Sequence, residues 1–317
     1  MGRLMDTPPP EADDASQQNT PGHLPVLAEE VLEWLDPKPG GRYCDLTVGM
    51  GGHARLVLER SAPDGKLIGM DRDPAALEMA RTLLEPFGDR VTLVHTRFSQ
   101  AREVLDRLGM VPVDGFLVDL GVSSPQLDRP ERGFSFRNDG PLDMRMDPTA
   151  GETAAQLLAR MDEEELEQVI RDYGEERHAA RVARAIVEAQ RSGPVDTTGK
   201  LAALVARALP RHERGKNPAT RTFQALRIAV NQELDELEQF LAAATDCLRP
   251  GGRLCIIAFH SLEDRIVKRR LRTLAGRDGG GPARLRILTK HVVVPHNDER
   301  VRNRRSRSAR LRAAERL

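Results

Sequence analysis

Apolar positions in the first half of the chain follow two alternating patterns. Short apolar runs typical of buried strands occupy 41–48, 65–71, 90–98 and 113–121. Segments with helical spacing lie between them, at 53–60, 74–87 and 101–108. This alternation predicts βαβ units and a parallel sheet with right-handed crossovers.

The pattern changes in the middle of the chain. From about Leu127 to Arg227 no strand pattern is clear, and a polar loop at 132–147 is followed by helical segments. Residues 220–248 then predict one long amphipathic helix or two abutting helices, and "RPGGRLCIIAFHS" predicts a turn into a fifth buried strand. We expect an α/β fold, a doubly wound and mostly parallel sheet with an inserted all-helical domain.

The expected domain boundaries follow from these patterns. Residues 1–20 are Pro-rich, acidic and polar, so they predict a disordered tail. Residues 21–127 together with 228–317 would form the α/β domain. Residues 128–227 would form the inserted helical domain.

Composition narrows the class of protein. Of the 317 residues, 39% are apolar, enough for a packed core. The three cysteines are scattered, which favours a reducing compartment, and no zinc spacing is present, so no metal is expected. The sequence shows neither a signal peptide nor an apolar run of about 20 residues, which predicts a cytoplasmic protein without a membrane span.

A glycine turn follows the first predicted strand. "CDLTVGMGGHA" places Gly49, Gly51 and Ala54 in the G-x-G-x-x-A spacing of dinucleotide-binding turns. The spacing alone is weak, because glycines also let a helix pack closely on a strand. Asp71, which ends the second strand, could accept hydrogen bonds from both hydroxyls of a ribose. A nicotinamide dinucleotide and S-adenosylmethionine both carry such a ribose.

Asp45 distinguishes between these two candidate ligands. A carboxylate four residues before Gly49 would repel a pyrophosphate but suits the ammonium and sulfonium groups of S-adenosylmethionine. Asp119 ends the fourth strand and should lie at the same edge of the sheet, where ligands bind in doubly wound folds. The pattern therefore favours methyl transfer over hydride transfer.

Several longer segments resemble one known family. "DLTVGMGGHA", "GVSSPQLD", "RGFSF", "NPATRTFQALRIAVNQEL" and "FHSLEDR" are similar to segments of the bacterial 16S rRNA (cytosine-N4)-methyltransferases. The resemblance runs from His23 almost to the C-terminus. It implies a class I methyltransferase fold, the cofactor S-adenosyl-L-methionine, and methylation of the N4 amine of a cytidine in the decoding region of 16S rRNA within the small ribosomal subunit. A homodimer is one alternative for the assembly.

The resemblance also implies roles for particular residues. The cofactor site would comprise Asp45, Gly49, Gly51, Gly52, His53, Asp71, Phe98, Asp119 and Gln126. Each has a simpler alternative. His53 could cap or pack a helix, Phe98 could belong to the core, and Gln126 could bond its own loop. Ser261, with His260, follows a strand and suggests a nucleophile, but no third partner is visible.

Methylation of an exocyclic amine requires alignment and a proton acceptor. Asp119 is the first candidate for that acceptor. Many exocyclic-amine methyltransferases carry an Asn- or Asp-Pro-Pro-aromatic loop here, whereas this chain has "DLGVSSPQ", which leaves the base-holding residues unassigned. Methylation at cytosine C5 would need a cysteine nucleophile, and none of the three cysteines follows a proline.

RNA contact should be largely electrostatic. Residues 301–317 hold seven arginines and one glutamate, a charge of 7 − 1 = +6. The candidate RNA-binding residues are Arg302, Arg304, Arg305, Arg307 and Arg310; the alternative is a solvated face or a strand edge kept soluble by its charges. Phe134 and Phe136 could stack on bases or pack within the insertion. A small-molecule methyltransferase or a non-catalytic RNA-binding assembly factor on the same fold stays a rival hypothesis.

Overall fold

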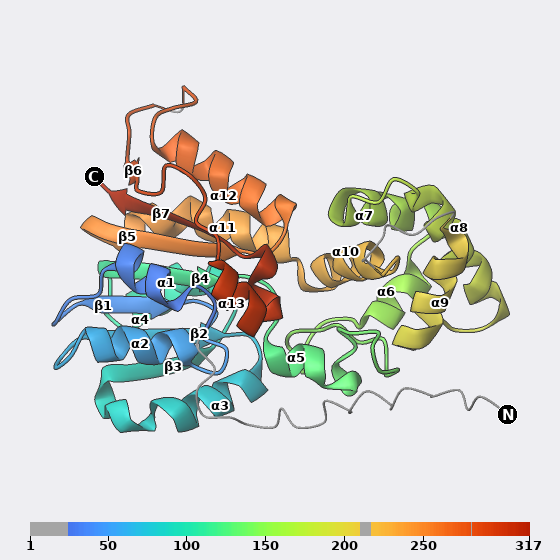
Figure 1. The fold of residues 1–317 in the computed structure, drawn as a ribbon, viewed down its shortest axis with the longest axis horizontal. Helices are drawn as coiled ribbons and strands as arrows, with labels where there is room; N and C mark the ends of the chain where they lie inside the picture. The colour runs from blue at the N-terminus through green and yellow to red at the C-terminus, as the bar shows by residue number, and fades with distance from the viewer. Residues whose placement is uncertain (1–24, 210–216, 280) are drawn as a thin grey trace, which may run out of the picture.

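A seven-stranded sheet forms the centre of the molecule (Figure 1), which we analysed as a computed structural model describing residues 25–209, 217–279 and 281–317. The expected tail at 1–20 lies outside these residues. The strand order is β3-β2-β1-β4-β5-β7-β6; β7 runs antiparallel to β5 and β6, and all other pairs are parallel. The strands are Arg42–Asp45 (β1), Lys66–Asp71 (β2), Val91–His95 (β3), Val113–Asp119 (β4), Leu248–Ala258 (β5), Leu285–Ile287 (β6) and Arg310–Arg316 (β7).

Helices cover both faces of this sheet, as the alternating pattern predicted. One face carries α1 (Ala28–Leu35), α2 (Gly52–Arg60) and α3 (Pro74–Leu84). The other carries α4 (Ala101–Arg107), α11 (Glu233–Cys247) and α12 (Ser261–Leu274). The expected doubly wound, mostly parallel α/β class is therefore confirmed.

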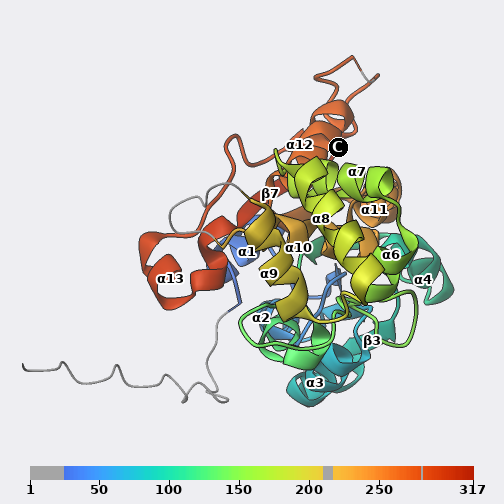
Figure 2. The same ribbon diagram turned by 90° about the vertical axis from the view of Figure 1, so that its right-hand side faces the viewer.

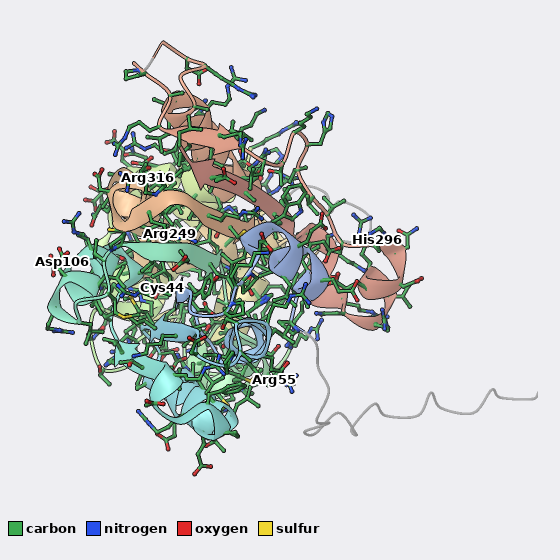
Figure 3. All side chains as sticks on the ribbon, turned by 90° about the vertical axis from the view of Figure 1, so that its left-hand side faces the viewer. Cys44, Arg55, Asp106, Arg249, His296 and Arg316 are labelled. Carbon is green, nitrogen blue, oxygen red and sulfur yellow. The ribbon has the colours of Figure 1, made fainter. Side chains whose placement is uncertain are left out.

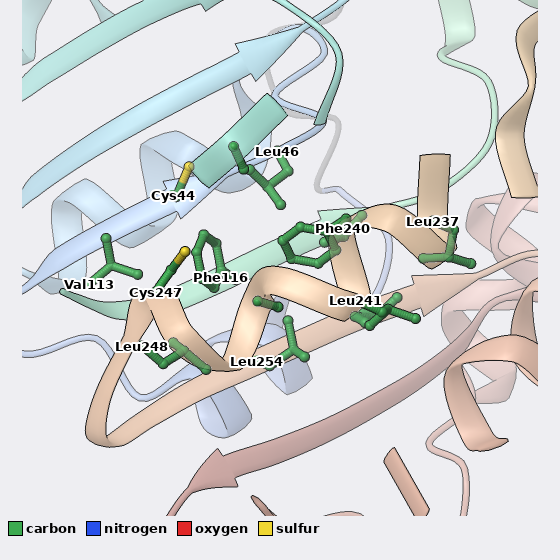
Figure 4. Close-up of a cluster of buried hydrophobic side chains, with 14 of the residues drawn as sticks. Cys44, Leu46, Val113, Phe116, Leu237, Phe240, Leu241, Cys247, Leu248 and Leu254 are labelled. Carbon is green, nitrogen blue, oxygen red and sulfur yellow. The ribbon is translucent and has the colours of Figure 1, made fainter. Parts of the chain in front are cut away.

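Large apolar side chains fix α11 to the sheet (Figure 4). Phe240 on α11 meets Phe116 of β4 edge to face, with ring centroids 5.4 Å apart. Leu237 and Leu241 are also buried on α11. Burial of each such side chain stabilises the fold by about 1.5–3 kcal/mol.

Local sequence signals set where the helices begin. Asp73 is the N-cap of α3 and accepts a hydrogen bond from the Ala75 amide, with Pro74 at the first helical position. Asp71, two residues earlier, is thereby free of a capping role.

Five helices form a separate unit beside the sheet (Figure 2), built around its own apolar core. They are α6 (Ala154–Arg160), α7 (Glu163–Gly174), α8 (Ala179–Ser192), α9 (Thr198–Ala208) and α10 (Thr220–Asn231). Phe134 belongs to this core and Phe136 packs edge to face on Phe223, 4.8 Å between centroids. Stacking on an RNA base is therefore not open to the buried Phe134.

The chain leaves the helical unit at Gln232. This residue has φ 53° and ψ 37° and separates α10 from α11, so the expected alternative of two abutting helices is the correct one. α10 buries Phe223 and Leu226 in the helical core, whereas α11 buries Leu237 and Phe240 on the sheet.

The C-terminus differs from the sequence prediction. Residues 310–316 read as part of a basic tail, but the structure inserts them between β5 and β6 as β7. Leu311, Ala313 and Ala314 are buried, while the arginines alternate with them toward the surface. Alternation with charged residues made this strand look like a solvated tail, and the short β6 was likewise not predicted.

All three cysteines are buried and unpaired. Cys44, labelled in Figure 3, belongs to the central strand β1. Burial raises the pKa of each thiol, that of Cys255 to about 12. None of the described helices is long and apolar enough to cross a membrane.

Candidate active site

A cavity of about 290 Å³ opens at the carboxyl ends of β1, β2 and β4, the edge at which doubly wound sheets bind ligands. Seven of the nine predicted cofactor-site residues line it. They are Gly49, Gly52, His53, Asp71, Phe98, Asp119 and Gln126. Asp45 and Gly51 are not among the lining residues.

The glycine turn closes one side of the cavity. Gly49 has φ +53° and Gly51 has φ +90°, a region that favours glycine. A Cβ on Gly51 would also lie 3.3 Å from carbon atoms of Leu84 on α3. Gly51 therefore serves both the turn and the close packing of α2 against α3.

Asp71 holds a fixed orientation at the end of β2. Its Oδ2 accepts a hydrogen bond from the Gly49 amide at 2.8 Å, and its Oδ1 accepts one from the Asp73 amide at 2.9 Å. Burial raises the pKa of Asp71 to about 6, against the lowering effect of these amides. Because each carboxylate oxygen has two lone pairs, both keep acceptor capacity toward the cavity.

Asp45 and Asp119 add two more carboxyl groups at neighbouring strand ends. Asp45 is only 2% exposed, and burial raises its pKa to about 7. Burial, with Asp45 and Glu263 nearby, raises the pKa of Asp119 well above its usual value. The Oδ1 atom of Asp119 has no hydrogen-bond partner in the described chain. A cationic ligand would relieve this crowding of acids.

His53 lies in the first turn of α2, beside Asp119. Its Nε2 is 3.8 Å from Asp119 Oδ2 and its side chain is 6% exposed. Burial lowers the pKa of His53 to about 4, so the imidazole is neutral at pH 7. The contact therefore joins a neutral ring to a carboxyl group. His53 packs in the interior and also forms part of the cavity wall.

Phe98 likewise serves two surfaces. It begins the 3-10 turn η2 (Phe98–Gln100), meets the Phe240 ring edge to face at 6.2 Å, and packs against the sheet core. It also lines the cavity. The core alternative and the cavity role are thus both compatible with its position.

Gln126 is engaged within the protein. It lies in α5 (Ser124–Asp128), where its Oε1 accepts from the Ser123 amide and its Nε2 donates to Asp73 Oδ2, each at 2.9 Å. Arg132 donates to the same Asp73 oxygen at 2.8 Å and to two backbone carbonyls, those of Arg145 and Met146. These contacts support the simpler alternative of a structural role for Gln126.

We expect Arg132→Met to destabilise the protein by about 3–5 kcal/mol, because it leaves the buried Asp73 carboxylate without its cationic partner and removes the donor that Arg132 gives to two carbonyls. Arg132 is 11% exposed and Asp73 2%. Urea unfolding measures the effect, with the exposed neighbour Glu131→Ala as control. A loss below about 1 kcal/mol for Arg132→Met, equal to ordinary surface changes, would contradict this.

Two acidic side chains of the cavity were missed by sequence reasoning. Glu263 lies in the first turn of α12 and accepts hydrogen bonds from the Phe259 and His260 amides, while its Oε1 lies 3.1 Å from His260 Nε2. Glu233 also lines the cavity. The H-x-x-E spacing at 260–263, a capping pattern in which His260 is the N-cap, is the signal that could have found Glu263.

Glu233, His260 and Glu263 could be considered as metal ligands, because their ligand atoms lie within 4.8 Å of one another. Both oxygens of Glu233, however, accept hydrogen bonds from Arg227, each at 2.8 Å. The Ser261 hydroxyl donates to Glu175 at the end of α7, so it faces the helical unit rather than a catalytic base.

The predicted RNA-binding arginines lie in three consecutive elements near the C-terminus. Arg302 ends α13 (Asn297–Arg302), and Arg304, Arg305 and Arg307 belong to the 3-10 turn η4 (Arg304–Ser308). Arg305 lines the cavity and donates to Asp128 at 2.5 Å. Arg310, in β7, lies 3.6 Å from Asp264. All but Arg305 are classed as exposed.

Comparisons with known proteins agree with this geometry. The chain is 53% identical over 310 residues to "Ribosomal RNA small subunit methyltransferase H" of Nitratidesulfovibrio vulgaris, covering 93% of this chain and 95% of the relative. A protein of the same name from Geobacter sulfurreducens is 53% identical over 309 residues, covering 93% and 99%.

A solved S-adenosylmethionine-dependent O-methyltransferase of Thermotoga maritima is 11% identical, with a TM-score of 0.41 and coverage of 92% and 64%. That likeness is too low to bear on function. The family model described as the MraW methylase family matches residues 20–317. This chain belongs to the MraW methylase family.

Proposed function

We propose that this protein transfers a methyl group from S-adenosylmethionine to the N4 amine of a cytidine in the decoding region of 16S rRNA, within the small ribosomal subunit of the cytoplasm. The observation that carries the proposal is the set of three carboxyl groups, Asp45, Asp71 and Asp119, at adjacent strand ends beside a glycine turn. The names of the curated relatives support the class of substrate.

The residues present fit the cofactor. Asp71 would hold the ribose hydroxyls, because its carboxylate is oriented by two amides and faces the cavity. Phe98 would border the adenine. Asp45, although behind the cavity wall, would contribute negative charge that favours a cationic ligand. The unpartnered Oδ1 of Asp119 is a further acceptor without a protein donor.

The bound cofactor supplies an electrophilic methyl group. The chain must place the cytosine amine in line with it, since positioning carries much of such a reaction. An acceptor then draws a proton from N4 as the amine lone pair attacks. Asp119 would act as that acceptor, and the neutral His53 ring 3.8 Å away would keep one side of its carboxylate from water.

The buried thiols favour N4 over C5. A C5 enzyme needs an accessible thiolate to attack the ring. Here the pKa of each cysteine is raised by burial. Cys44 and Cys255 lie in strands, and Cys247 is the last residue of α11. We further propose that the helical unit at 128–227 contributes to substrate recognition, because it stands beside the cavity mouth and supplies Met146 to its lining.

We expect Asp71→Asn to weaken binding of S-adenosylmethionine by about 10–100-fold, since hydrogen bonds to a charged acceptor are worth about 1.5–3 kcal/mol each. The asparagine side chain has only one acceptor oxygen. In Asp71 each of the two carboxylate oxygens already accepts a hydrogen bond from a backbone amide, that of Gly49 or that of Asp73. Isothermal titration calorimetry measures the change, with the exposed Asp64→Asn as control. A shift smaller than about twofold at Asp71 would contradict the assigned role.

The affinity for S-adenosylmethionine should rise with pH between 5.5 and 7.5. At the acid end of this range, where binding releases one proton, the affinity should rise about tenfold per pH unit. In the free protein Asp45 and Asp71 have pKa values near 7 and 6. A cationic ligand favours their ionised forms, so binding releases protons below those values and ceases to do so above them. Calorimetry in two buffers of different ionisation enthalpy counts the protons.

The same titration with the Asp45→Asn variant tests whether this carboxyl group causes the pH dependence. The pH dependence should flatten, because one of the two titrating groups is gone. A wild-type affinity that stays constant over this range, or that falls as pH rises, would show that these carboxyl groups do not face the cation.

Methyl transfer itself is tested by incubating the protein with unmethylated small ribosomal subunits and cofactor carrying a labelled methyl group. Label in 16S rRNA supports the proposal. Label only in small molecules would favour the small-molecule rival. Tight RNA binding with no label in any acceptor would favour the non-catalytic assembly factor.

A further inference from the structure

A second cavity, of about 270 Å³, adjoins the first. It lies between the segment that follows β4 and the turn η4, and its polar lining comes from Asp128, Ser135, Arg137, Asn138 and Arg305. Arg305 lines both cavities, so the two meet at its side chain. Figure 1 shows α5 beside α13 and the chain that continues it, and the hydrogen bond from Arg305 to Asp128 joins these segments.

The lining of the second cavity carries donors that the protein does not use. Arg137 is exposed, and within the described residues its guanidinium has neither an ion pair nor a hydrogen bond. Arg305 has one acidic partner, Asp128, whose side chain is 60% exposed. The charged lining groups sum to +2 − 1 = +1. Arg304 and Arg307 flank Arg305 in the chain and are also exposed.

We propose that the second cavity binds a backbone phosphate of the RNA strand next to the nucleotide that is methylated. This rests on the proposed function, because a target base in the first cavity must be joined to a flanking phosphate outside it. Because the two cavities share Arg305 as a lining residue, the second cavity lies where the flanking phosphate would leave the first. Arginine guanidinium groups recognise phosphate by paired hydrogen bonds.

The ion pair between Arg305 and Asp128 gives the proposal a distinctive consequence. In the free protein Asp128 occupies the guanidinium of Arg305. The phosphate would compete with Asp128 for that guanidinium, so Asp128 opposes RNA binding while Arg305 and Arg137 favour it. Removing the acid and removing the bases should therefore change RNA affinity in opposite directions.

The test compares three variants of the full-length protein, Arg137→Ala, Arg305→Ala and Asp128→Asn. Binding is measured by fluorescence anisotropy with a labelled single-stranded RNA oligonucleotide, and methylation with unmethylated small ribosomal subunits. We expect Kd for the oligonucleotide to rise about 5–10-fold in each arginine variant, with the slope of log K against log salt reduced by about 1. Asp128→Asn should lower Kd about 2–5-fold. Cofactor affinity should stay unchanged in Arg137→Ala and Asp128→Asn, since neither residue lines the first cavity.

Arg60→Ala is the matched control, since Arg60 is exposed at the far end of α2 and has no ion pair or hydrogen bond within the described part of the chain. If Arg137→Ala binds RNA like this control, the phosphate site is wrong. If Asp128→Asn weakens binding as Arg305→Ala does, the pair is structural and the competition is refuted.

Oligonucleotide binding tests the phosphate site, whereas methylation of ribosomal subunits tests the proposed function, so the two can fail separately. Wild-type protein that methylates subunits, with all variants equal to wild type in RNA binding, refutes only the phosphate site. Opposite shifts in oligonucleotide affinity without any methylation of subunits support the site and refute the proposed reaction.

Discussion

Asp119→Asn is expected to lower kcat for methyl transfer by about 10²–10⁴-fold, the usual contribution of a positioned general base. Asp119 ends β4, lines the cavity, and has an oxygen that no described residue bonds. The amide keeps the size of the side chain but cannot take a proton from N4. Single-turnover kinetics with saturating cofactor measures the loss directly.

The matched control is Asp114→Asn, in the same strand but away from the cavity, where the side chain faces Arg249. It should cost stability without changing kcat. Because the pKa of Asp119 is raised in the free protein, the rate of the wild-type enzyme should increase with pH until that carboxyl group ionises. A kcat for Asp119→Asn within about threefold of wild type would assign proton acceptance elsewhere.

Deleting residues 301–317 is expected to abolish folding rather than to remove RNA binding alone. β7 pairs with β5 over six residues and with β6 over three. It buries Leu311, Ala313 and Ala314, and its Arg312 is ion-paired with Asp264 on α12. Hydrogen bonds at about 1 kcal/mol each, with the lost apolar burial, amount to roughly the whole stability of a domain.

Circular dichroism and size-exclusion chromatography test this deletion. The matched variant replaces Arg302, Arg304 and Arg307 by Gln, which removes three exposed charges but keeps the strand. It should retain the melting temperature to within a few degrees and bind RNA more weakly. A deletion variant that is folded and cooperative in unfolding would contradict the role given to β7.

Sequence reasoning found the parts of the fold where local pattern and tertiary environment agree. Four short apolar runs and the Pro-Gly-Gly turn into a fifth predicted β1 to β5, because these strands, apart from the edge strand β3, bury residues on both faces. It missed β7, whose arginines alternate with small apolar residues and whose partners are distant in sequence. Long-range pairing with β5 overrides the local preference there.

The candidate site shows the same division. The acids at strand ends could be placed together from sequence, because parallel strands end at one edge of the sheet. That Asp45 lies behind the cavity wall, and that Gln126 is held by Ser123 and Asp73, depends on side-chain packing that no local pattern carries. The competition between Asp128 and RNA at Arg305 likewise appears only when segments far apart in sequence meet.

The central claim is the identity of the methylated atom, and mass spectrometry of the modified nucleosides tests it most directly. Unmethylated small ribosomal subunits are incubated with the protein and labelled cofactor, and the 16S rRNA is digested and mapped. We predict one labelled nucleoside, N4-methylcytidine, within the decoding region, and none with Asp119→Asn over the same time. Label at cytosine C5, on a ribose, or in no nucleoside would contradict the account.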